Sequence, residues 1–103
     1  MQLIEKLSDM IEDELDDAEK YIRCAIDKKE SYPSLASTFN KLSMDEMTHV
    51  NLLHDQVVML INEYRSKNGN PPEKMQNIYD YIHKRHIEHA NEIKILQGVY
   101  SSK

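Results

Sequence analysis

The sequence predicts an all-α protein, a single domain over residues 1–103 built from three antiparallel helices. Three observations lead to this expectation. Apolar residues recur at steps of three and four along most of the chain, which is the period of an amphipathic helix. The residues that interrupt helices are few, two glycines and three prolines, and most of them gather at two places. Both predicted connections are short, so consecutive helices should run antiparallel.

The first helix is expected over residues 2–29. Its inner stripe follows from advancing about 100° per residue along the chain, as an α-helix does. Glu14 falls inside this stripe, and Tyr21 lies beside Glu14 two turns further on. The apolar members of the stripe are Ile4, Leu7, Ile11, Ala18, Ile22 and Ala25.

The second helix, over residues 33–67, carries a similar mixed stripe. Pro33 lies in its first turn, where a missing amide is tolerated, and Gly69 follows its end. On the helical wheel, Glu46 and His49 of the segment SMDEMTHV fall on the apolar side. The apolar members of this stripe are Leu35, Phe39, Leu42, Leu53, Val57, Leu60 and Tyr64.

The third helix is expected over residues 71–100. It opens on Asn70-Pro71-Pro72-Glu73, which resembles a capping box with prolines in the first turn. His86 and His89 fall on its apolar stripe with the same angular placement that Glu46 and His49 have on the second helix. The apolar members are Met75, Ile78, Tyr79, Ile82, Ala90, Ile93, Leu96 and Tyr100.

Composition excludes several classes of function. The net charge of -5 and the lack of basic clusters argue against nucleic acid or an anionic membrane as a partner, since both demand a cationic face. Cys24 is the single cysteine, which excludes an internal disulfide framework and a cysteine zinc site. An N-terminal apolar signal and an 18-residue apolar run are both absent from the sequence, so we expect a cytoplasmic protein.

The polar residues on the inner stripes predict a metal site. Counted outward from the first turn, Glu14 and Glu46 are about fourteen to fifteen residues away, and so they should lie nearly level. An unpaired buried carboxylate costs several kcal/mol, so Glu14, Glu46 and His49 need a partner, and iron, manganese or zinc suits this ligand set. The alternative is that both glutamates reach water at the stripe edge and His49 is an ordinary half-buried histidine.

Two further groups leave alternatives open. His89 is about as far from the second turn as His49, so an antiparallel third helix could bring His89, and His86 with it, near the ligands. Otherwise the histidine-rich face packs against the other helices or against a second copy. The acidic run of the first helix is interpreted as a solvated face that could also attract cations. This run consists of Glu12, Asp13, Asp16, Asp17 and Glu19.

Glu14 followed by Tyr21, and then Glu46-Met47-Thr48-His49, resembles the Glu-x6-Tyr and Glu-x-x-His pattern of the ferritin-like superfamily. The similarity covers roughly residues 11 to 60. It implies that Glu14, Glu46 and His49 are ligands of a di-iron centre and that Glu46 bridges the metals. It also implies that Tyr21 is an outer-shell or redox-active neighbour.

The chain differs from full-length ferritins and rubrerythrins because it supplies one such helix pair and they supply two. The resemblance is therefore to the small encapsulated-ferritin type, in which two short chains complete a four-helix bundle, and it implies a homodimer or a higher even oligomer. The tail QGVYSSK lacks the linker and docking peptide of that type, so loading into a shell is not expected.

Two functions remain as hypotheses. One is a ferroxidase, an oxidoreductase that oxidises Fe(II) with dioxygen or peroxide at a carboxylate and histidine site. The other is a non-enzymatic helical scaffold or interaction protein with a structural or vestigial metal site, in which buried polar residues fix the register of the helices.

Overall fold

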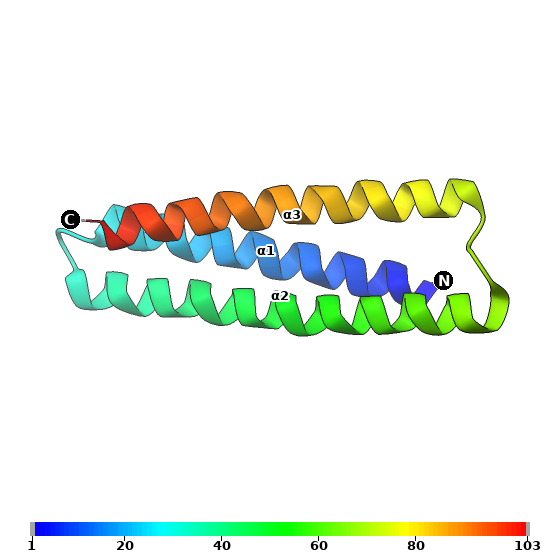
Figure 1. Cartoon of the computed structure of the whole chain (residues 1–103). Helices are drawn as coiled ribbons and strands as arrows, with labels where there is room; N and C mark the ends of the chain where they lie inside the picture. The colour runs from blue at the N-terminus through cyan, green and yellow to red at the C-terminus, as the bar shows by residue number, and fades with distance from the viewer. Residues whose placement is uncertain (1, 103) are drawn as a thin grey trace.

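The computed structural model describes residues 2–102, and the prediction of an all-α protein is confirmed for them. The chain forms α1 (Gln2–Lys28), α2 (Pro33–Asn68) and α3 (Glu73–Ser101). It runs along α1, returns along α2 and runs forward again along α3 (Figure 1). The three helices make a rod of 55 × 18 × 18 Å. Within residues 2–102, no helix combines the length and the apolar character needed to cross a bilayer.

Helix α1 is the centre of the bundle. It packs against both α2 and α3, which contact each other much less (Figure 1). Its buried residues alternate steps of four and three, as in a coiled coil, and they are Ile4, Ser8, Ile11, Leu15, Ala18, Ile22 and Ala25. This differs from the expected stripe, because Leu15 is fully buried and Leu7 only partly. Glu14 consequently lies at the edge of the buried stripe.

Helix α2 presents small residues to α1. Ala36 and Ser43 have no exposed surface and Val50 has 7%, and each follows the last after two turns. Leu35, expected on the buried stripe, is 45% exposed. The contact line is rotated from the expected stripe because small side chains let two helix backbones approach closely. Phe39, Glu46 and Leu53 therefore flank the contact line.

A buried polar link joins the three helices. The Ser43 hydroxyl of α2 donates to the Ala18 carbonyl oxygen of α1 at 2.7 Å, and the Gln97 amide of α3 donates to the Ser43 oxygen at 3.1 Å. Because a buried polar group without a partner is destabilising, these bonds favour one register over others. The link lies one turn from Glu46 and holds α1 and α2 at the height at which Glu14 and Glu46 meet.

The two turns are formed differently from each other. Gly69 ends α2 with φ 76°, in the left-handed region that glycine adopts without strain, and its amide donates to the Arg65 carbonyl at 2.9 Å. The expected capping box before α3 is wrong, because α3 begins at Glu73 and no side chain caps it. Pro72 is extended (ψ 145°) and disfavours helical geometry at Pro71, so neither proline enters the helix.

Candidate metal centre

The predicted site residues Glu14, Glu46 and His49 come together between α1 and α2. Each offers one ligand atom, and the three atoms lie within 4.8 Å of one another. Glu14 comes from the edge of the buried stripe of α1. Glu46 and His49 lie one turn apart on α2 and therefore share a face. The counting of residues from the first turn thus places the two helices correctly at this height.

The separations within this group suit a shared ligand. His49 Nδ1 lies 3.4 Å from Glu14 Oε2 and 3.5 Å from Glu46 Oε2. Two ligands of a tetrahedral metal with bonds of about 2.0–2.1 Å are about 3.3–3.4 Å apart. The observed spacing would therefore allow an ion to bind with little movement of these side chains.

One oxygen of this group has no hydrogen bond, although His49 Nδ1 lies 3.5 Å away. Glu46 Oε2 is buried and receives no hydrogen bond from any residue in the described part of the chain. A buried acceptor left in this state costs about 1–3 kcal/mol, and more when it is charged. A cation placed between the carboxylates would remove that cost. The residues present therefore fit a metal ion by the chemistry of their donor atoms and by this unpaired oxygen.

Burial differs among the three side chains. The side chain of Glu46 is 18% exposed and that of Glu14 is 29%, but that of His49 is 52%. The expectation that His49 lies on a buried face is therefore wrong. The rotation of α2 about its axis turns His49 toward solvent, where it covers the outer side of the two carboxylates.

Tyr21 lies about two turns, roughly 10 Å, along α1 from Glu14. Its half-buried ring stacks on Phe39 of α2, with ring centroids 6.2 Å apart and planes inclined by 23°. Within residues 2–102, no hydrogen bond joins Tyr21 to the three candidate ligands. The structure thus shows Tyr21 packing between the two helices that carry the site.

His89 and His86 do not join this group. His89 Nε2 lies 2.8 Å from Glu19 Oε1, and His86 Nε2 lies 3.3 Å from Glu12 Oε2. The expected height of His89 does not determine which side of α1 it meets, and α3 packs on the side that carries Glu12 and Glu19. His89 instead forms a second group of possible metal ligands with Glu12 and Asp16.

Two pKa shifts accompany this second group. Burial lowers the pKa of His86 below its usual value, His83, His54 and His89 act in the same direction, and Glu12 opposes them. The hydrogen bond from Arg23 holds the pKa of Glu19 below its usual value, burial opposes this, and His89 supports it. His86 is therefore favoured as a neutral imidazole and Glu19 as a carboxylate.

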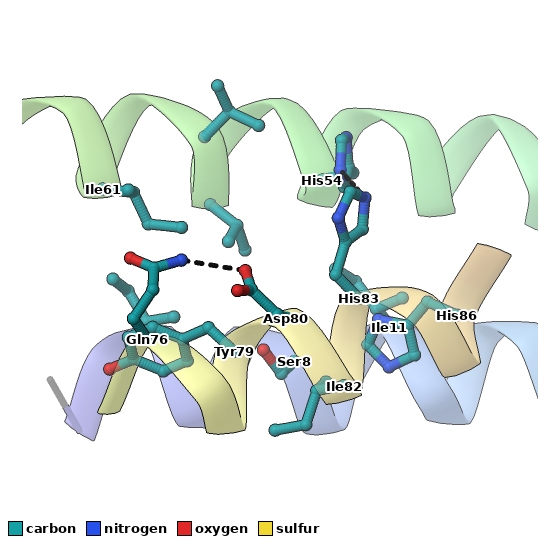
Figure 2. A pocket seen from close by; sticks show the side chains of 13 residues that line it. Ser8, Ile11, His54, Ile61, Gln76, Tyr79, Asp80, Ile82, His83 and His86 are labelled. Atoms are coloured by element: carbon teal, nitrogen blue, oxygen red, sulfur yellow. Dashed lines mark hydrogen bonds between the residues drawn. The ribbon is translucent and has the colours of Figure 1, made fainter. Parts of the chain in front are cut away.

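Between α2 and α3, two more histidines face each other. His54 Nε2 and His83 Nε2 lie 3.1 Å apart with stacked rings, so one ring donates and the other accepts (Figure 2). They border a cavity of about 100 Å³ whose lining is mainly apolar. This pair was not predicted from the sequence, because His83 lies off the apolar stripe expected for the third helix.

Comparison of the chain with protein-family models, with curated proteins and with solved structures finds no match. The chemistry of the site is therefore argued from its own geometry.

Proposed function

We propose that the protein binds Fe(II) at Glu14, Glu46 and His49 and oxidises it, as a ferroxidase of ferritin-like type. The observation that carries this proposal is the unpaired, buried Oε2 of Glu46. A protein gains nothing from such an oxygen unless a ligand meets it. The spacing of Glu14 and Tyr21, and of Glu46 and His49, adds support because it is the pattern of ferritin-like proteins.

The ligand set favours iron among the common cations. Two carboxylates and one imidazole provide oxygen and nitrogen donors. This mixed set suits iron, manganese and zinc, whereas calcium and magnesium prefer oxygen donors alone. Carboxylate oxygens favour Fe(III) over Fe(II), so they assist the loss of an electron. Each Fe(II) loses one electron and becomes Fe(III). Two such electrons and two protons from solvent reduce dioxygen to hydrogen peroxide, or reduce peroxide to two molecules of water.

The protein's own residues hold, expose and screen the substrate ion. Glu46 provides the buried anchor and Glu14 closes the space from the other helix. His49 is half-exposed, so it stands where ions and a small oxidant enter from solvent. Tyr21 is proposed as an outer-shell neighbour that affects electron transfer. Its ring stacks on Phe39 and lies about two turns from Glu14 on the same helix.

A di-iron centre of the ferritin-like type needs ligands from two such helix pairs, and one chain supplies a single pair. We therefore infer that two copies share the centre, as a homodimer or a higher even oligomer. Exposed apolar side chains on α2 support this inference, since Leu52, one turn from His49, and Met59, two turns further along, are each 61% exposed. A second copy would cover them and would bring its own carboxylates and histidine.

A non-enzymatic scaffold is the alternative function. It is favoured by the 3.4 Å contact between His49 and Glu14, which can form an ion pair without a metal when His49 is protonated. It is also favoured by the Ser43 link, which shows that this bundle uses buried polar groups to fix helix register. Under this alternative the metal site is structural or vestigial, and the protein would not oxidise iron.

The test compares two glutamates of α2. We expect Glu46→Ala to abolish most Fe(II) binding and the protein-dependent growth of ferric absorbance in air. The control, Glu63→Ala, removes an exposed glutamate that pairs with Lys67, and it should leave both unchanged. Equal losses in the two variants would refute the site. A wild-type protein that binds Fe(II) but oxidises it no faster than buffer does would refute the enzyme while leaving the metal site.

A further inference from the structure

A second group of possible ligands lies on the opposite side of α1. Glu12 and Asp16 come from α1, one turn apart, and His89 comes from α3. Their ligand atoms lie within 4.8 Å of one another. Glu14 lies two positions after Glu12, a step that turns the side chain by about 200° around the helix. This group is therefore separate from the site described above, and the inference does not rest on the proposed ferroxidase.

The orientation of the His89 imidazole is fixed by its contact with Glu19. Its side chain is only 17% exposed, and Nε2 lies 2.8 Å from Glu19 Oε1. Arg23 Nε holds the same glutamate at 2.9 Å. When Nε2 donates to Glu19, Nδ1 is left with a free lone pair on the side of Glu12. Histidines that bind metals usually donate their second ring N–H to a carboxylate in this way, which sets both tautomer and orientation.

The other nitrogen of His89 lacks a hydrogen bond to the carboxylate in front of it. Nδ1 lies 3.8 Å from Glu12 Oε1, beyond the roughly 2.7–3.2 Å of an N–H···O bond. A protonated His89 paired with both carboxylates would explain the contact with Glu19 but would draw Glu12 closer. The 3.8 Å separation is somewhat wider than the roughly 3.3–3.4 Å between two ligands of one tetrahedral metal, so Glu12 would move a few tenths of an ångström toward a shared ion.

His86 lines the same space. Its side chain is 12% exposed, and Nε2 lies 3.3 Å from Glu12 Oε2. The two oxygens of Glu12 thus face two imidazoles that lie one turn apart on α3. Glu12 is 40% exposed and Asp16 is exposed, so the space between α1 and α3 is open to ions from solvent.

We propose that Glu12, Asp16 and His89 form a second metal site, for a first-row transition-metal dication, with His86 beside it and Glu19 as the positioning residue. Imidazole in the ligand set favours Zn²⁺, Co²⁺ or Fe²⁺ over Ca²⁺ and Mg²⁺, which prefer oxygen donors alone. The site draws on both α1 and α3. An ion there fastens α3 to α1 at mid-height.

The test uses Co²⁺ as the probe in a chain that already carries Glu46→Ala, so the first site is disabled whether or not it functions. We expect this chain to bind Co²⁺ with visible d–d absorbance and to broaden the NMR ring signals of His89. Adding Asp16→Asn should weaken Co²⁺ binding at least tenfold. Glu19→Gln should weaken it about tenfold, because it removes the carboxylate behind the ring.

Asp17→Asn is the matched control. It makes the same change of charge at an exposed neighbour on α1, and it should leave Co²⁺ affinity unchanged. Both substitutions are at exposed positions, so both chains should fold. Equal weakening by Asp16→Asn and Asp17→Asn would show general attraction to an acidic surface and would overturn the site. Absence of Co²⁺ binding in the Glu46→Ala chain, or broadening that spares His89, would overturn it as well.

Discussion

The two sides of α1 carry the same kinds of side chain in opposite arrangements of burial. Toward α2, the glutamate Glu46 is the most buried ligand and the histidine His49 is half-exposed. Toward α3, the histidine His89 is largely buried and the carboxylates of Glu12 and Asp16 are the more exposed groups. Both groups hold two carboxylates and one imidazole within 4.8 Å.

This difference determines which side needs a ligand. His89 contacts Glu19 at 2.8 Å whether or not an ion is present, and the nearby carboxylates of Glu12 and Asp16 are accessible to solvent. On the α2 side, the buried Oε2 of Glu46 receives no hydrogen bond from the described residues. Of the two ligand groups, only the one on the α2 side lowers the free energy of unfolding when no ion is bound. Metal binding should therefore change the stability of the fold more through Glu46 than through His89.

The largest effect on stability is expected from replacing Glu46 with an apolar residue of similar size. In metal-free protein, Glu46→Leu should raise the free energy of unfolding by about 1–3 kcal/mol, because it removes an unpaired buried carboxylate. In wild-type protein, an ion at one hundred times its dissociation constant adds about 2.7 kcal/mol, and the variant should lose this gain. Urea denaturation with and without Fe(II), in the absence of oxygen, measures both effects.

The opposite signs are the informative result. His89→Leu is the companion variant, and it should destabilise metal-free protein because it removes the contact of His89 with Glu19 and leaves Arg23 as the remaining partner of that carboxylate. If Glu46→Leu destabilised metal-free protein as much as His89→Leu does, the carboxylate of Glu46 would be stabilised by a partner even without metal. The α2 side would then not differ from the α3 side in its need for an ion.

A smaller effect comes from a second unpaired buried oxygen, the hydroxyl of Tyr79 on α3. No group of possible metal ligands includes this residue among those found in residues 2–102. Tyr79→Phe should therefore leave metal binding unchanged and stabilise the protein by about 1 kcal/mol or less. Calorimetry of metal-free and metal-loaded protein should give the same shift in both, whereas the shift for Glu46→Leu should differ between the two by about 2.7 kcal/mol.

Tyr79 also predicts a dependence on alkaline pH. Burial raises the pKa of its hydroxyl, and Glu5 and Tyr64 act in the same direction. Below about pH 10 both folded and unfolded states are protonated and the full stability is present. As the pH rises further, the unfolded chain ionises first and stability falls. Tyr79→Phe should reduce this fall, and an identical alkaline profile in both proteins would contradict the burial of the hydroxyl.

The helices and their order could be predicted because apolar periodicity and a few glycines and prolines determine them. The side on which neighbouring helices pack was predicted less well. Leu15 on α1 and Ser43 on α2 are fully buried although neither was assigned to a core stripe. The sequence pattern does not give the exact rotation of a helix about its axis, and this rotation decides which residues at the stripe edge are covered. The capping box failed for a local reason, the extended conformation at Pro72.

Prediction of the site reached the same limit. Height along the bundle follows from counting residues, so Glu14 and Glu46 were correctly placed level with each other. Position around α1 depends on where α3 docks, and counting does not reveal it. His89 was therefore expected near Glu14 but lies beside Glu12. The alternation of Glu12, Glu14 and Asp16 was the available signal, since such residues face opposite sides of one helix.

The most direct test of the central claim is a crystal of the protein grown with Fe(II) under nitrogen and measured at the iron absorption edge. We expect an anomalous difference peak about 2.0–2.2 Å from carboxylate oxygens of Glu14 and Glu46 and from Nδ1 of His49. A peak at the Glu12 and His89 group alone, or iron bound only to exposed carboxylates, would contradict the proposal that the buried Glu46 oxygen exists to bind a metal.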